Sequence, residues 1–176
     1  MKSVVLLGTN HSIQLGLNAP DEFRIVLINE CEKNKVRVIA EEIGEYEVTI
    51  ASMLAAQLQL TYLNADPGLQ ERMVRGIPIN IPLEIMSQYD KKYPIIMMWP
   101  RDPNKDNLPE EVWAEYTRRN NHAFRMREKV WLEKIDSLDK WPLLFICGTD
   151  HFDPFSKLLK SSNYEVVETY KNWNPC

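Results

Sequence analysis

The chain has 176 residues, of which 44% are apolar and 26% are charged, and its formal net charge is −4. This composition is typical of a folded globular domain and excludes disorder as the main state. The acidic balance also argues against a nucleic-acid partner bound through its phosphate backbone, because such binders usually carry an excess of basic residues.

The N-terminal segment, residues 1–8, contains only four consecutive apolar residues, which is too few for a signal peptide and indicates a first strand instead. No apolar run approaches the roughly 18 residues that a membrane span requires. The three cysteines, Cys31, Cys147 and Cys176, are odd in number and lack metal-ligand spacing. We therefore expect a cytoplasmic protein with reduced thiols and no membrane partner. The oligomeric state is left open.

Short apolar runs predict strands, and apolar residues at helical spacing predict helices between them. Strands that alternate with helices indicate an α/β fold, in which a mostly parallel sheet is flanked by helices and residues 1–176 form a single domain. In chain order, the expected elements are a strand at 4–7, a helix from 20 or 21 to about 33, a strand at 36–40, a helix at about 45–56, a strand at 58–63, short helices at 69–74 and 83–89, a long helix at about 109–135, a strand at 143–147, a helix at 154–161 and an edge strand at 164–170.

The middle of the chain, residues 67–109, is rich in proline and holds seven of the eleven prolines. A regular strand–helix unit does not tolerate this density, so the segment is expected to leave the sheet. It is interpreted as a helical and loop insertion within the domain, with a mobile loop at 100–108. A structural insertion and a lid that covers substrate remain equal alternatives.

The long helix that follows carries an apolar stripe, which at 100° per residue is formed by Trp113, Tyr116, Phe124, Trp131, Ile135 and Leu138. Asn120 and Arg127 fall in the middle of this stripe, whereas His122 lies on the opposite, solvated face. An arginine in an apolar stripe needs a buried or cleft-lining partner, because an unpaired buried charge is very costly. This requirement singles out Arg127 as a candidate functional residue.

Two near-identical tetrapeptides, Gly8-Thr9-Asn10-His11 and Gly148-Thr149-Asp150-His151, each begin where an apolar strand ends. Ligand sites in open parallel sheets form at the carboxyl ends of the strands, and Glu41 and Glu42 end another strand at the same edge. The glycines are expected to allow a sharp turn away from the strand. We therefore expect one shared site, and the candidate catalytic residues are His11, Glu41, Glu42, Arg127 and His151. The candidate substrate-binding residues are Asn10, Asp66, Asn120 and Asp150.

Each of these residues has a simpler structural explanation when taken alone. A single histidine at a strand end is more often hydrogen-bonded in place than catalytic, and a helix arginine most often belongs to an ion pair. Cys147 adjoins Gly148, but its apolar surroundings favour a buried strand thiol over a nucleophile. The repetition of the Gly-Thr-x-His pattern is what favours a functional site.

The paired motifs, with an acid after the second strand and Arg127 before the last motif, resemble the superfamily of Tiki/TraB peptidase-like proteins, erythromycin esterases and haem-binding ChaN proteins. The resemblance spans residues 4–155 and keeps the order of the motifs. Trp131 stands where the family pattern has methionine, and the doubled glutamate leaves open whether Glu41 or Glu42 is the family acid. The resemblance implies hydrolysis of an ester or amide in a small-molecule or peptide substrate, or capture of haem.

The residues allow more than one mechanism. Without a metal, a histidine or glutamate is a general base on water, the other histidine is a general acid, and Arg127 stabilises negative charge. With a divalent metal, His11, Glu41 and His151 supply two imidazoles and one carboxylate. We favour the metal-free version, because the positive charge of Arg127 beside the carboxylate raises the electrostatic cost of binding a divalent metal ion there.

Two alternatives to catalysis stay open. One is a haem- or small-ligand-binding protein, for which Trp99, Met97 and Met98 are candidate contacts, although their simpler interpretation is packing within the insertion. The other is an inactive relic that binds a partner. The sequence does not identify a cofactor or the substrate.

Overall fold

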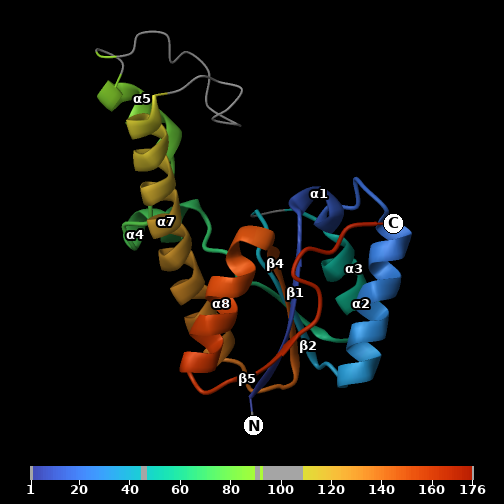
Figure 1. Cartoon of the computed structure of the whole chain (residues 1–176). Helices are drawn as coiled ribbons and strands as arrows, with labels where there is room; N and C mark the ends of the chain where they lie inside the picture. Colours follow the sequence, from blue (N-terminus) through green and yellow to red (C-terminus); the bar gives the residue numbers. More distant parts are fainter. Residues whose placement is uncertain (1, 45–46, 90–91, 93–108, 176) are drawn as a thin grey trace. The chain divides into compact units, whose positions relative to one another are not determined.

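The computed structural model describes residues 2–44, 47–89, 92 and 109–175 (Figure 1). The chain forms two compact units. The first consists of residues 1–68 and 128–176, and the second of residues 69–127. The long helix α7, Glu110–Asp136, begins in the second unit and ends in the first. The segments expected as a mobile loop and as haem contacts, 100–108 and 97–99, lie outside the described residues.

The first unit contains a five-stranded sheet in which every strand pair is parallel, which confirms the predicted α/β fold. The order of the strands across the sheet is β3-β2-β4-β1-β5. The strands are β1 (Ser3–Thr9), β2 (Val38–Glu41), β3 (Thr61–Asn64), β4 (Leu143–Gly148) and β5 (Glu165–Glu168). The last strand lies at the edge of the sheet, as its alternating pattern predicts.

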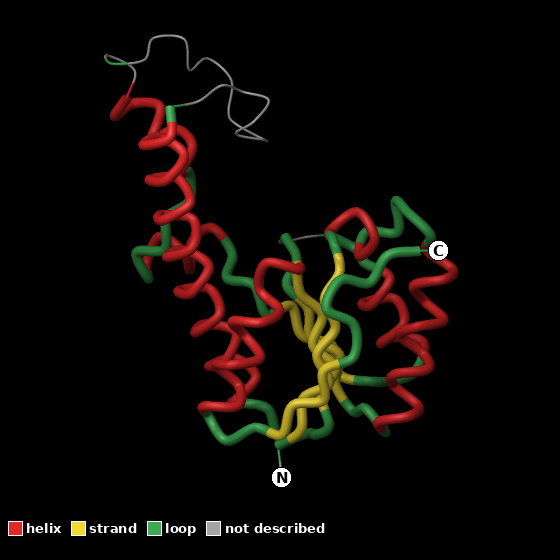
Figure 2. Tube along the Cα trace, viewed as in Figure 1, coloured by secondary structure: helices red, strands yellow, loops and turns green. Residues whose placement is uncertain are grey.

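Helices lie on both sides of this sheet (Figures 1 and 2). The first unit contains α1 (His11–Gln14), α2 (Pro20–Asn34), α3 (Ile50–Gln57) and α8 (Thr149–Ser161), together with the C-terminal part of α7. The second unit contains α4 (Leu69–Val74), α5 (Ile81–Tyr89) and the N-terminal part of α7. None of the helices in the described ranges has the length and apolar character needed to cross a membrane.

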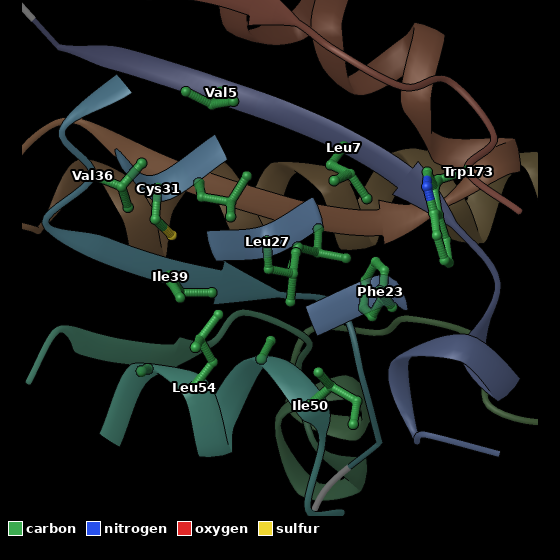
Figure 3. Packing of buried hydrophobic residues seen from close by; sticks show 14 of the residues in the cluster. Val5, Leu7, Phe23, Leu27, Cys31, Val36, Ile39, Ile50, Leu54 and Trp173 are labelled. Atoms are coloured by element: carbon green, nitrogen blue, oxygen red, sulfur yellow. The ribbon is translucent and has the colours of Figure 1, made fainter. Parts of the chain in front are cut away.

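The two faces of the sheet bury different side chains, because successive residues of a strand point to opposite sides. Val5 and Leu7 of β1 pack on one face with Phe23 and Leu27 of α2 and with Leu54 of α3, as Figure 3 shows. The other face is covered by α8 and by the end of α7. Its buried side chains include Val4, Leu6, Phe145, Phe155 and Trp131. Both faces of the sheet are therefore covered by helices.

The second unit has a small core of its own. Ile81 and Ile85 of α5 are buried against Val112 and Ala123 of α7, and Tyr116 packs on this cluster. This unit begins at Leu69, two residues after the expected start of the proline-rich insertion, and continues past the expected end at residue 109 to Arg127 of α7.

Several boundaries differ from the prediction. The third helix begins at Ile50 instead of residue 45, because Thr49 and Ser52 form reciprocal hydrogen bonds that cap it there. The helix expected from Pro154 begins five residues earlier, at Thr149, and accommodates the proline internally. The short helix α1 was not predicted, since four residues are too few to show a helical period.

Candidate functional site

The candidate site lies at the carboxyl ends of three neighbouring strands. Strand β4 pairs with β1 on one side and with β2 on the other. The register aligns Thr9 with Gly148 and Glu41 with Ile146, so both Gly-Thr-x-His motifs and the Glu41-Glu42 pair leave the sheet at the same edge. The predicted convergence of two histidines and a glutamate is therefore present in the first unit.

Each histidine is held at the beginning of a helix. Asn10 caps α1 by accepting a hydrogen bond from the backbone N–H of Ile13 at 3.1 Å, which makes His11 the first residue of that helix. Asn10 also accepts a hydrogen bond from Ser12 at 2.6 Å. Gly148 precedes α8, and His151 is the third residue of that helix. Asn10, predicted to bind substrate, thus has a clear capping role.

Glu42 is the residue on which the site converges. One carboxylate oxygen, Oε2, accepts a hydrogen bond from the backbone N–H of Gly148 at 3.0 Å. The other, Oε1, lies 3.5 Å from Nε2 of His11 and 3.9 Å from Nε2 of His151. Both imidazoles therefore approach the same oxygen, and the two nitrogens are closer than the roughly 10 Å beyond which a shared site would be untenable. Of the predicted pair, Glu42 is the acid between the histidines.

A second carboxylate, Glu128 of α7, lies on the other side of the His151 ring. Its Oε1 is 2.7 Å from Nδ1 of His151, and both side chains are almost completely buried. Trp131, one turn further along α7, packs against the ring with its centroid 4.7 Å away. These contacts fix the orientation of the imidazole. A buried carboxylate at Nδ1 also favours the tautomer that carries its proton there, so Nε2 presents a lone pair.

His11 differs from His151 in its exposure. Its side chain is 53% exposed, against 4% for His151 and 2% for Glu42. The accessible imidazole thus adjoins a buried carboxylate–histidine–carboxylate arrangement, Glu42–His151–Glu128. An outside molecule therefore meets His11 before it meets the buried groups.

Glu41 takes no part in this arrangement, although it adjoins Glu42 in the sequence. Its Oε1 accepts hydrogen bonds from the hydroxyl groups of Thr49 and Tyr62, the latter at 2.7 Å. Burial raises the pKa of Glu41 from 4.5 to about 7, an effect that the two hydrogen bonds and the charge of His11 only partly offset. Its Oε2 is buried and has no hydrogen-bond partner among the described residues. Glu41 is therefore a buried acid that is still partly protonated near neutral pH.

The two motif glycines are needed for close packing. A Cβ atom at Gly8 would lie 2.1 Å from the carbonyl oxygen of Lys171, in the C-terminal segment that crosses the end of β1. That segment is joined to Gly8 by hydrogen bonds from Gly8 N–H to Tyr170 and from Trp173 N–H to Gly8, both 2.7 Å. At Gly148, a Cβ would lie 3.3 Å from Oε2 of Glu42. Neither glycine has a positive φ, so the close approach of neighbouring atoms, and not a left-handed backbone, distinguishes these two positions.

The remaining predicted residues have other surroundings. Asp66 accepts a hydrogen bond from the indole of Trp131 at 3.2 Å, and Asp150 is exposed in the first turn of α8. Arg127 and Asn120 belong to the second unit, where both line a cavity. Their part in the histidine site stays a prediction.

Two interpretations made from the sequence are confirmed. His122 is exposed on α7, as its place opposite the apolar stripe predicts. Cys147 is buried, and desolvation together with the nearby charges of Glu42 and Glu128 raises the pKa of its thiol well above the ordinary value. A buried, protonated thiol is a poor nucleophile, in agreement with the structural interpretation of this residue.

The metal alternative named His11, Glu41 and His151 as ligands. Within the described ranges, no three histidine, cysteine, aspartate or glutamate side chains are placed to hold a metal ion. The physical reason is that Glu41 is turned toward Thr49 and Tyr62, so this triad does not form in the structure.

Sequence reasoning missed Glu128 and Gln14. Glu128 lies four residues after Phe124 and three before Trp131, which at 100° per residue places it at the border of the apolar stripe, about 60° from Trp131. The stripe therefore gives a weaker signal for this glutamate than for Arg127. Gln14 is buried on α1 and donates a hydrogen bond to the backbone carbonyl of Glu42 at 3.4 Å. A polar residue on a four-residue helix leaves no periodic signal.

No family model, no curated protein and no solved structure matches this chain. The resemblance to the Tiki/TraB, erythromycin esterase and ChaN superfamily thus stays a prediction, and the functional argument depends on the geometry of the site.

Proposed function

We propose that the protein is a hydrolase that activates water between His151 and Glu42 for attack on an ester or amide. The observation that carries the proposal is the 3.9 Å separation between Nε2 of His151 and Oε1 of Glu42. With the proton of His151 directed to Glu128, both atoms present lone pairs. In the proposed mechanism, a water molecule beside them donates one hydrogen to each.

The proton transfers follow from this placement. His151 takes a proton from the water at Nε2, and Glu128 stabilises the imidazolium that forms, through its contact at Nδ1. The hydroxide oxygen bonds to the substrate carbonyl carbon, and the π electron pair of the C=O bond moves to the carbonyl oxygen. When the C=O bond forms again, the bond to the leaving alkoxide or amine breaks and protonated His11 donates a proton to the leaving group, since its ring is exposed. The proton held by His151 then passes through water to His11, which restores both imidazoles. Glu42 holds the water and attracts both imidazolium ions.

Glu42 is preorganised for this role. Its Oε2 is fixed by the backbone N–H of Gly148, so the carboxylate does not have to reorganise when charge moves to the histidines. The nearly complete burial of Glu42 and His151 strengthens their electrostatic interaction relative to water. The mechanism uses only residues of the first unit.

The experiment is a hydrolysis assay with p-nitrophenyl esters of short acids and the matching p-nitroanilides. We expect Glu42→Gln and His151→Asn to lower kcat/KM by at least about 100-fold, the size of a general-base contribution. The exposed histidine of α7 supplies a matched control, and His122→Asn is expected to retain wild-type kcat/KM.

A folded protein that turns over no member of the panel would overturn hydrolysis of esters and amides. Equal activities of His151→Asn and His122→Asn would overturn the assignment of the base. Because His151 is buried against Trp131, thermal unfolding of each variant is measured alongside the assay. The exposed His11→Gln variant tests the acid with less risk to folding, and we expect its deficit to be greatest with poor leaving groups.

A further inference from the structure

Residues 170–175 follow the edge strand β5 and pass the carboxyl end of β1 (Figure 1). They extend the parallel pairing of β5 with β1, since Gly8 N–H donates a hydrogen bond to the carbonyl of Tyr170 at 2.7 Å. The N–H of Trp173 donates a hydrogen bond to the carbonyl of Gly8, also at 2.7 Å. This segment therefore lies at the edge of the sheet where the two Gly-Thr-x-His motifs begin.

Trp173 anchors the segment. Its side chain is buried in the apolar cluster that includes Phe23 of α2, and the two ring centroids are 5.1 Å apart, as Figure 3 shows. A large buried aromatic side chain contributes strongly to packing, so it restrains the backbone that carries it. Asn172 and Asn174, which are exposed on either side of Trp173, are thereby held next to the motifs.

The two residues before the histidine of the first motif are bonded to this segment. The hydroxyl of Thr9, which is completely buried, donates to the carbonyl oxygen of Trp173 at 3.0 Å. The side-chain amide of Asn10 donates to Oδ1 of Asn174 at 3.4 Å, while its own Oδ1 caps the helix that begins with His11. The segment therefore holds the backbone immediately before His11.

The threonine of the second motif contacts the same segment. The hydroxyl of Thr149, the first residue of α8, donates to Oδ1 of Asn172 at 3.0 Å. It also lies 3.5 Å from the carbonyl oxygen of Thr9. One segment thus joins both motifs through the hydroxyl groups of their threonines, which the hydrolytic steps themselves do not use.

We propose that segment 170–175 sets the placement of His11 relative to His151, and that the two motif threonines are positioning residues. The proposal rests on the proposed hydrolase, because it concerns the distance from the proton donor, His11, to the water activated beside His151. A displacement of about 1 Å near the reacting groups can lower a rate about 100-fold. Loss of a threonine hydroxyl is therefore expected to lower kcat and to change KM little, since neither threonine is assigned a contact with substrate.

The variants are Thr9→Val and Thr149→Val, which keep the branched shape of the side chain and remove the hydroxyl group. Thr9→Ser and Thr149→Ser keep the hydroxyl group and are expected to retain wild-type behaviour. Thr169→Val is the matched control, because the hydroxyl of Thr169 also donates to a backbone carbonyl, that of Leu6 at 3.0 Å, but precedes the segment and touches neither motif. Thermal unfolding confirms that each variant is folded.

Two measurements are made on each variant. The first is kcat and KM with a p-nitroanilide, whose poor leaving group needs the proton donor. We expect kcat to fall at least about tenfold in both valine variants and KM to stay within about twofold. The second is ¹H–¹³C NMR of the histidine rings without substrate. We expect the His11 ring signals to move in Thr9→Val, whereas those of His122, exposed on α7, stay unchanged as an internal reference.

Three outcomes would overturn the proposal: valine variants that match Thr169→Val in both measurements, a Thr9→Val variant with moved His11 signals and wild-type kcat, and serine variants as impaired as the valine variants. A wild-type protein that hydrolyses no substrate would overturn the hydrolase instead. The NMR measurement then decides the placement of the histidines by itself, since unmoved His11 signals in Thr9→Val would overturn the role of the segment and moved signals would support it.

Discussion

Replacing Glu41 by glutamine tests whether this buried acid is neutral in the folded protein. The substitution keeps the shape of the side chain and an oxygen that can accept hydrogen bonds from Thr49 and Tyr62. What it removes is the ability to ionise. Because Glu41 is completely buried, ionisation in the folded state has a large desolvation cost, whereas in the unfolded chain it does not.

The magnitude follows from the pKa of Glu41. A rise from 4.5 to about 7 means that the folded protein binds this proton more tightly than the unfolded chain does. Each tenfold change in affinity is about 1.4 kcal/mol, so the cost of ionised Glu41 reaches about 3 kcal/mol. The cost is absent below pH 4.5, grows as the pH rises and is complete above about pH 7. Ionisation of Glu41 thus lowers the free energy of unfolding as the pH rises.

The assay is urea unfolding of the wild type and of Glu41→Gln between pH 5 and pH 8. We expect the variant to gain stability relative to the wild type across this range, by about 2–3 kcal/mol in total. Glu47→Gln is the control, because Glu47 is exposed on the same connection between β2 and α3 and reports the effect of removing one surface charge. A stability difference between Glu41→Gln and the wild type that stays constant with pH would refute the reasoning.

Three other substitutions or treatments test the packing around the site. Gly8→Ala forces a Cβ against the carbonyl of Lys171, and we expect urea unfolding to show a loss of about 2–4 kcal/mol; a loss below about 0.5 kcal/mol would contradict the close approach. Glu128→Gln removes the negative charge beside Nδ1 of His151. We expect ¹⁵N NMR of the imidazole ring to show the Nδ1–H tautomer in the wild type and a larger share of the Nε2–H tautomer in the variant. A wild-type protein already in the Nε2–H form would contradict the assignment of His151 as the base. Cys147 is expected to resist alkylation in the native protein and to react in urea, as peptide mapping by mass spectrometry would show, and equal labelling in both conditions would contradict its burial.

Strands β1, β2 and β4 were predictable because each buries a short apolar run, and both faces of the sheet are covered. The ends of the helices were less predictable, since they depend on particular capping contacts. The Thr49–Ser52 pair at the start of α3 lacks the glutamate or glutamine of the usual capping box. Pro154 predicted a helix start at its own position, but α8 begins five residues earlier, at Thr149. Reciprocal hydrogen bonds, which a periodic pattern does not reveal, decide the start of α3, whereas α8 begins after Gly148 without a side-chain cap.

The site was only partly predictable for a topological reason. Motifs at strand ends meet only if their strands are neighbours, and the chain order of β1, β2 and β4 does not specify this. The strand order β3-β2-β4-β1-β5 puts β4 between the other two, which brings Glu42 within reach of both histidines. The choice between Glu41 and Glu42 depends on which way each side chain leaves the end of β2. The sequence does not determine this at a strand end.

The two Gly-Thr-x-His motifs are alike in sequence but produce unlike histidines, and the difference comes from the helices that follow. α1 has four residues, so His11 at its start stays exposed. α8 has thirteen residues and packs on the sheet, so His151 near its start is buried. A buried imidazole needs a hydrogen-bond partner, and the carboxylate of Glu128 supplies one at Nδ1. A buried histidine with a carboxylate at Nδ1 is suited to accept a proton, and an exposed one is suited to deliver a proton to a departing group. The mechanism that we propose therefore assigns different roles to the two copies of the motif, with Glu42 between them.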